Sequence, residues 1–229
     1  MIGVWVNMFA VIIGGSIGTF LRSGISAKYR SIINSALGLC SLAIGITGAI
    51  KTHDMMGIII ALVLGGVLGE LIRIEYGLDK LGNWAQKKLA KNDAGFSQGF
   101  VSATLLFCIG AMAVVGSLEA GLSNKPDTLL AKSMMDGVSS IIFASSMGPG
   151  VILSALPLTL YQGGIAMLSG LLAPVLSEGI INEISAAGGL LIIGIGINLL
   201  GMTKERIKVG NLLPAMVVVV VYQAITGLF

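Results

Sequence analysis

The sequence has few charged residues for its length. Only 11% of its 229 residues are charged and 55% are hydrophobic, which gives a mean hydropathy of +0.96. Ordinary soluble domains carry about 25% charged residues, so this composition excludes such a domain. We expect residues 1–229 to form a single integral membrane domain embedded in the lipid bilayer.

Histidine and cysteine are scarce, which limits the metal sites, disulfides and catalytic groups that the chain can form. The one histidine, His53, stands beside Asp54, and the two cysteines, Cys40 and Cys108, fall within apolar runs. In an apolar run, a cysteine is expected to act as a small buried hydrophobic residue, in preference to a disulfide partner or a metal ligand. The sequence shows no Ser/His or paired-Asp arrangement and no phosphate-binding loop after a strand. We therefore expect no enzyme, no metal site and no cofactor.

Basic residues are also nearly absent before the first apolar run, which favours a retained helix over a cleaved signal peptide. Apolar runs bounded by charges predict an all-α, polytopic transmembrane bundle of about eight spans: 3–22, 31–50, 55–74, 98–118, 129–147, 151–173, 184–202 and 212–228. Gly148-Pro149-Gly150 alone separates the fifth span from the sixth, which Pro157 and Gly163-Gly164 interrupt. This region is predicted as two full spans, two half-helices or a re-entrant hairpin.

The basic residues predict the orientation of the chain. Three loops, after the first, third and seventh spans, hold 11 of the 14 basic residues. These loops are expected in the cytoplasm, with both termini outside. Residues 75–93 carry an apolar stripe at helical spacing and lysines opposite it, which predicts a cytoplasmic interfacial amphipathic helix. Its acidic residues and the lack of an aromatic stacking platform indicate no nucleic-acid partner.

Two nine-residue segments share the pattern G-G-x-x-G-x-x-x-R. Gly14 to Arg22 carries it first, and Gly65 to Arg73 repeats it 51 residues later. Glycines strip one helix face of side chains, so they predict close helix packing or a backbone approach that lines a permeation path. The glycines concerned are Gly14, Gly15, Gly18, Gly65, Gly66 and Gly69.

A second repeat links the two ends of the chain. Gly38-Leu39 and Ile44-Gly45-Ile46 match Gly189-Leu190 and Ile195-Gly196-Ile197 at one offset of 151. The second and seventh spans run in opposite directions. The match therefore predicts inverted topology between the first three spans and the last three, as in many secondary transporters.

Asp136 is the main candidate for a functional residue inside the membrane, because burying a charge there costs at least ~2.5 kcal/mol. Ser139 and Ser140 lie one turn beyond it. Alternatively, Asp136 pairs with Lys132 near the outer surface. Tyr161 and Gln162 interrupt the sixth span, and with Asp136 and the serines they complete a predicted path for a solute or ion.

Glu70 and Asn198 are further candidates for this path. Glu70 has an alternative in pairing with Arg73 or Arg22. Asn198, like Asn7 and Gln223, is an amide in an apolar run, where helix-to-helix hydrogen bonding is the common role. Asn211 is expected to cap the last helix, which has Pro214 in its first turn.

The whole chain resembles the bacterial membrane-protein family of domain of unknown function 554, the YdfK/YqgA group. Three parts of the chain carry the resemblance: Gly65 to Glu75; Met135-Asp136-Gly137 with Ser154 to Pro157 and Tyr161 to Gly163; and Gly188 to Gly201 followed by Gly210 to Ala215. The resemblance implies a bacterial inner-membrane protein without an established substrate. The glycine motif alone is similar to the first helix of fluoride channels.

These patterns lead to two functional hypotheses. The first is a transporter or channel for a small solute or ion, with its path near the broken fifth and sixth spans. The second is a scaffolding membrane protein that forms a homo-oligomer through its glycine-rich helix faces.

Overall fold

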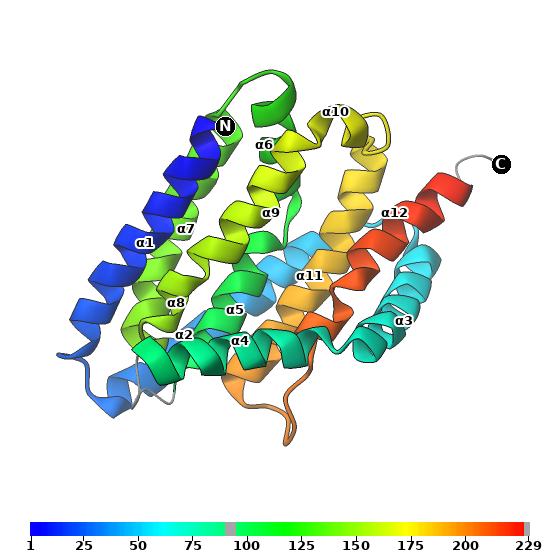
Figure 1. The fold of residues 1–229 in the computed structure, drawn as a ribbon. Coiled ribbons are helices and arrows are strands. Elements are labelled where there is room, and N and C mark those ends of the chain that lie inside the picture. Colours follow the sequence, from blue (N-terminus) through cyan, green and yellow to red (C-terminus); the bar gives the residue numbers. More distant parts are fainter. Residues whose placement is uncertain (90–94, 227–229) are drawn as a thin grey trace.

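The protein is a bundle of α-helices in the computed structural model, which describes residues 1–89 and 95–226 (Figure 1). No strand occurs in these two ranges. This confirms the predicted all-α, polytopic class. The helices are α1 (Ile2–Arg22), α2 (Ala27–Ala49), α3 (Met55–Ile72), α4 (Ile74–Leu89), α5 (Phe96–Cys108), α6 (Ala111–Leu122), α7 (Asp127–Met147), α8 (Gly150–Leu153), α9 (Ala155–Met167), α10 (Ser169–Leu172), α11 (Glu178–Leu200), the 3-10 helix η1 (Val209–Leu212) and α12 (Pro214–Thr226).

Three closely packed helix pairs form the framework, and glycines lie at each crossing. α1 runs parallel to α7, because its successive glycines Gly3, Gly14 and Gly18 meet successively later residues of α7. α2 packs against α11, and α3 against α12, in antiparallel fashion. Glycine allows this because two helix backbones can approach closely only where no side chain separates them.

Within residues 1–89 and 95–226, six helical segments are long and apolar enough to cross a membrane, and the bent pair α5 and α6 adds a seventh if it counts as one span. α7 has 21 residues and packs along α1, but its charged residues and serines place it outside this set. The count of eight spans, which requires α7, stays a prediction.

One predicted span contains a sharp break that the sequence did not indicate. α5 and α6 meet at an angle of 62°, around Ile109 and Gly110, within the predicted fourth span. Gly110 has φ 130° and ψ 153°, a backbone region open almost only to glycine. In contrast, α7 continues to Met147, and α8 with α9 forms one apolar segment, Gly150–Met167. The path predicted near the fifth and sixth spans stays a prediction.

The bundle has two distinct ends. Figure 1 places the N-terminus and the end of α12 at one end, called here the N-terminal end. α4 lies across the opposite end, called the α4 end, and the loops after α1 and α11 are also found there. On α4, Glu75 and Ala85 are buried, and Lys88 lies 4.6 Å above the Trp84 ring. Residues 90–93 of the predicted interfacial helix fall outside the described ranges.

Candidate functional site

A buried ion pair lies in the middle of α7. The Lys132 Nζ is 2.9 Å from Oδ1 and 2.7 Å from Oδ2 of Asp136, one helical turn on. The two residues are 7% and 6% exposed. The pairing considered as an alternative from the sequence is thus present, and both residues are buried in the bundle. A pair taken out of water is costly to keep unless further hydrogen bonds complete it.

Two amides extend this pair toward α1 and α9. The Asn7 Nδ2 donates to Asp136 Oδ2 at 2.9 Å and to Gln162 Oε1 at 3.3 Å. Both amides are fully buried. Asn7 Oδ1 and Gln162 Nε2 have no hydrogen-bond partner among the described residues. Four polar side chains from three helices therefore meet at one place, and the lone amide in the first apolar run was the sequence signal for Asn7.

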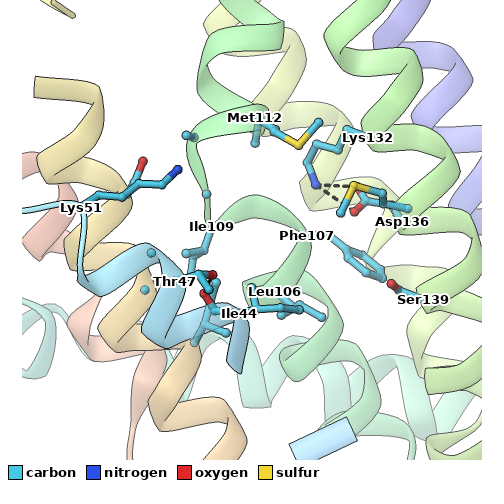
Figure 2. A pocket seen from close by; sticks show the side chains of 18 residues that line it. Ile44, Thr47, Lys51, Leu106, Phe107, Ile109, Met112, Lys132, Asp136 and Ser139 are labelled. Carbon is cyan, nitrogen blue, oxygen red and sulfur yellow. Dashed lines mark hydrogen bonds and ion pairs between the residues drawn. The ribbon is translucent and has the colours of Figure 1, made fainter. Parts of the chain in front are cut away.

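A pocket of about 370 Å³ opens beside the ion pair, at the break between α5 and α6 (Figure 2). Helices α2, α5, α6, α7 and α11 surround it. Most of its wall is apolar, and Ile44, Leu106, Phe107, Ile109 and Met112 contribute to it. Its polar side chains are Thr47, Lys51, Lys132, Asp136, Ser139 and Ser185.

The amino end of α6 also borders the pocket, through Gly110, Ala111 and Met112. The residue at the cap position is Gly110, which has no side chain to cap this end. The first N–H groups of a helix lack partners within the helix and carry about half a positive charge together. Lys51 approaches the same segment from the end of α2, with its amino group directed toward the break (Figure 2).

A tightly packed apolar layer lies between the pocket and the α4 end. Phe107 and Phe143 are 1% and 2% exposed, and their rings meet edge to face with centroids 6.5 Å apart. Leu37, Met147 and Val151 belong to the same buried cluster. Since Phe143 and Met147 follow the ion pair along α7, this layer separates the polar site from the α4 end.

The structure brings together only part of the predicted path. Asp136 and Ser139 line the pocket, whereas Ser140 faces α1 beside Gly14, with its hydroxyl buried and unpartnered among the described residues. Gln162 joins the polar cluster from α9 through Asn7 but does not line the pocket. Tyr161 does not line it either. Its hydroxyl lies within electrostatic range of the Cys108 thiol, which in turn is within range of Lys132 and Asp136.

Glu70 and Asn198 lie apart from this cluster, and Glu70 has other partners than expected. Its carboxylate accepts from Lys208 Nζ at 2.7 Å and from Asn211 Nδ2 at 2.5 Å. The neighbouring Arg73 instead ends α3 with φ 59°. In place of the pairing proposed with Arg73 or Arg22, the carboxylate thus bonds to the loop and η1 that precede α12. Both partners were missed because they are 138 and 141 residues away.

Asn198 and Asn211 have structural roles at the α4 end. The Asn198 amide exchanges two hydrogen bonds of 2.8 Å with the backbone of Ile207, which fixes the loop after α11. Asn211 lies in η1, where its Oδ1 accepts from the Glu75 N–H at 2.7 Å. It joins the turn between α3 and α4 to the start of α12, and this replaces the helix cap expected from the sequence.

The six glycines of the repeated motif all face other parts of the same chain. A side chain at any of them would meet a neighbouring segment. Those of α1 contact α7 and α8, and those of α3 contact η1 and α12. The pairs are Gly14 with Gly137, Gly15 with Ile152, Gly18 with Ile141, Gly65 with Ala215, Gly66 with Leu212 and Gly69 with Asn211.

Comparisons with known proteins give a family without an assigned activity. Residues 2–224 match the family described as "Protein of unknown function (DUF554)". The uncharacterised membrane protein YdfK of Bacillus subtilis is 35% identical, over 95% of this chain and 93% of its own. The uncharacterised protein YqgA of Escherichia coli is 31% identical, over 94% and 93%. No solved structure matches the chain significantly.

Proposed function

Because the chain belongs to the DUF554 family of membrane proteins, we propose that it transports a small solute or ion across the bacterial inner membrane through the pocket between α2, α5, α6, α7 and α11. One observation carries this proposal: the buried Lys132–Asp136 pair lines a cavity at a break in a membrane helix. Irregular backbone at such depth is tolerated where it is buried in protein or lines a wet cavity. Broken helices also form the substrate sites of many secondary transporters.

The position of the pocket supports alternating access. The apolar layer of Phe107 and Phe143 closes the side toward the α4 end. A transporter needs such a barrier on one side of its substrate in each state, and the barrier must then form on the other side. The bend at Gly110 is where α6 can move relative to α5, since hinges are short segments that absorb backbone rotation.

The scaffolding hypothesis has less support in this structure. It relied on glycine-rich faces for contacts between copies of the chain, yet those glycines contact α7, α8, η1 and α12 of the same chain. An oligomer would therefore need a different surface.

Transport can be tested with purified protein in liposomes, with solute uptake measured for a panel of ions and metabolites. Asp136→Asn keeps the shape of the side chain and is expected to abolish uptake or its pH dependence. Asp127→Asn is the matched control, since Asp127 lies in the first turn of the same helix and is exposed. Equal uptake by the wild type, Asp136→Asn and empty liposomes would exclude the proposal.

A further inference from the structure

We propose that the pocket binds a small organic anion with one negative charge and an apolar body, and that Asp136 competes with this anion for Lys132. This inference rests on the proposed function and names its substrate class. It depends on three features of the pocket: its charge balance, its apolar wall and the arrangement of the ion pair.

The charge balance of the pocket favours an anion. Its wall carries two lysines and one carboxylate, a formal net charge of +1. Asp136 is already engaged by Lys132, while Lys51 forms no ion pair with any residue of the described ranges. The amino end of α6 adds to the positive potential at the same wall. A cationic substrate would be repelled by Lys51 and by this helix end, whereas one negative charge on the substrate neutralises the surplus.

The size and lining of the pocket favour an organic substrate. About 370 Å³ is far more than one water molecule needs and lies in the usual range for small-molecule sites, roughly 300–1,000 Å³. Apolar side chains of α2, α5 and α6 form most of the wall. A carboxylate can therefore contact the lysines while its hydrocarbon part contacts Ile44, Leu106 and Met112.

Because it already pairs with Lys132, Asp136 competes with a bound anion for that lysine. Both of its oxygens lie within 2.9 Å of Lys132 Nζ, and Asn7 holds the carboxylate from the side of α1. Lys132 is the charged group in contact with Asp136, the Cys108 thiol lies within electrostatic range of it, and Lys51 lines the same pocket. Since Asp136 is the one acid among the pocket-lining residues, a substrate carboxylate reaches Lys132 by displacing it.

Three probes with the same body test the charge preference. Thermal unfolding of the purified full-length protein in detergent is followed with sodium butyrate, butyramide and butylammonium chloride, and sodium chloride serves as the ionic control. Butyrate is expected to raise the unfolding temperature with saturation, and the other three are not. Stabilisation by butylammonium, an equal effect of chloride and butyrate, or no effect of butyrate would each overturn the proposal.

Variants of the pocket charges test the competition. Asp136→Asn is expected to tighten butyrate binding about tenfold, within the range measured for removal or addition of a close charge. Lys51→Met is expected to weaken it about tenfold, and Lys51→Arg to restore it. Lys125→Met, in an exposed loop outside the pocket, is the control. Weaker binding in Asp136→Asn would reject the competitor role, and if that variant does not fold, the two Lys51 variants still decide whether the pocket binds the anion.

Uptake in liposomes separates this inference from the proposed function. Uptake of a cation or neutral solute without butyrate binding would keep the transporter and reject the anion site. Butyrate binding without any uptake would keep the site and reject transport.

Discussion

Gly45 packs directly on Gly189 where α2 crosses α11, and Gly38 packs on Gly196 seven residues away. A Cβ atom added at Gly45 would lie 2.6 Å from the Gly189 carbonyl oxygen, and one at Gly189 would lie 2.5 Å from that of Gly45. In the repeat with offset 151, Gly38 corresponds to Gly189 and Gly45 to Gly196. Each contact thus joins opposite members of the two copies, which is the pattern of a two-fold axis. The inverted repeat stays a prediction, and this reciprocal contact supports it.

The crossing of α2 and α11 should not tolerate a side chain. Gly45→Ala is expected to lower the stability of the protein by about 1–3 kcal/mol, because overpacking forces two backbones apart. Gly164→Ala is the matched control, since Gly164 also lies inside a helix and a Cβ there would meet nothing within 4 Å. The control should be neutral or stabilise by about 0.5–1 kcal/mol. Thermal unfolding in detergent measures both, and equal effects would show that the crossing can adapt.

The ion pair of α7 should show strong coupling between its members. Lys132→Met or Asp136→Asn alone leaves one buried polar partner unpaired and is expected to cost up to about 3–5 kcal/mol. The double variant removes both charges and should cost much less than the sum. Stability measurements on the four proteins form a double-mutant cycle. Additive effects would mean that each residue is satisfied without the other.

The sequence predicted the helices well because apolar runs and glycine motifs are local signals. It located Asp136 and Ser139 because a charge in an apolar run is conspicuous. It did not predict the break at Gly110, which lies between α5 and α6. A single glycine in an apolar run is too common in this chain to stand out.

Partners distant in the sequence could not be predicted. Asn7 and Asp136 are 129 residues apart, and nothing in either segment specifies the other. The same is true of Lys51, which lies just after α2 and reaches the pocket because α2 packs against α11 and α7. The site is therefore formed by the packing of whole helices, and in the sequence its residues are isolated polar positions.

Glu75 should make stability depend on pH. Burial raises its pKa above the ordinary value of about 4.3, although the Gly210 N–H at 2.6 Å and Arg206 at 3.7 Å act in the opposite direction. The folded protein therefore binds this proton more tightly than the unfolded chain does. The resulting stability is complete below about pH 4 and is lost as the pH rises through the raised pKa.

Glu75→Gln should remove this dependence, because the amide stays neutral and can still accept from Gly210. The unfolding temperature, measured from pH 4 to pH 8, should fall less steeply in the variant than in the wild type. Glu205→Gln, an exposed acid in the neighbouring loop, is the control. Identical pH profiles of wild type and Glu75→Gln would show that another group causes any change.

The orientation of the bundle gives the last prediction. The loop that contains Lys204, Arg206 and Lys208 lies at the α4 end, opposite the N-terminus and the end of α12 (Figure 1). Basic loops remain in the cytoplasm, so a fluorescent protein fused after Lys208 should fluoresce, and alkaline phosphatase fused there should be inactive. Fusions after Phe229 should give the reverse pattern. Cytoplasmic signals at both positions would mean that α12 does not cross the membrane.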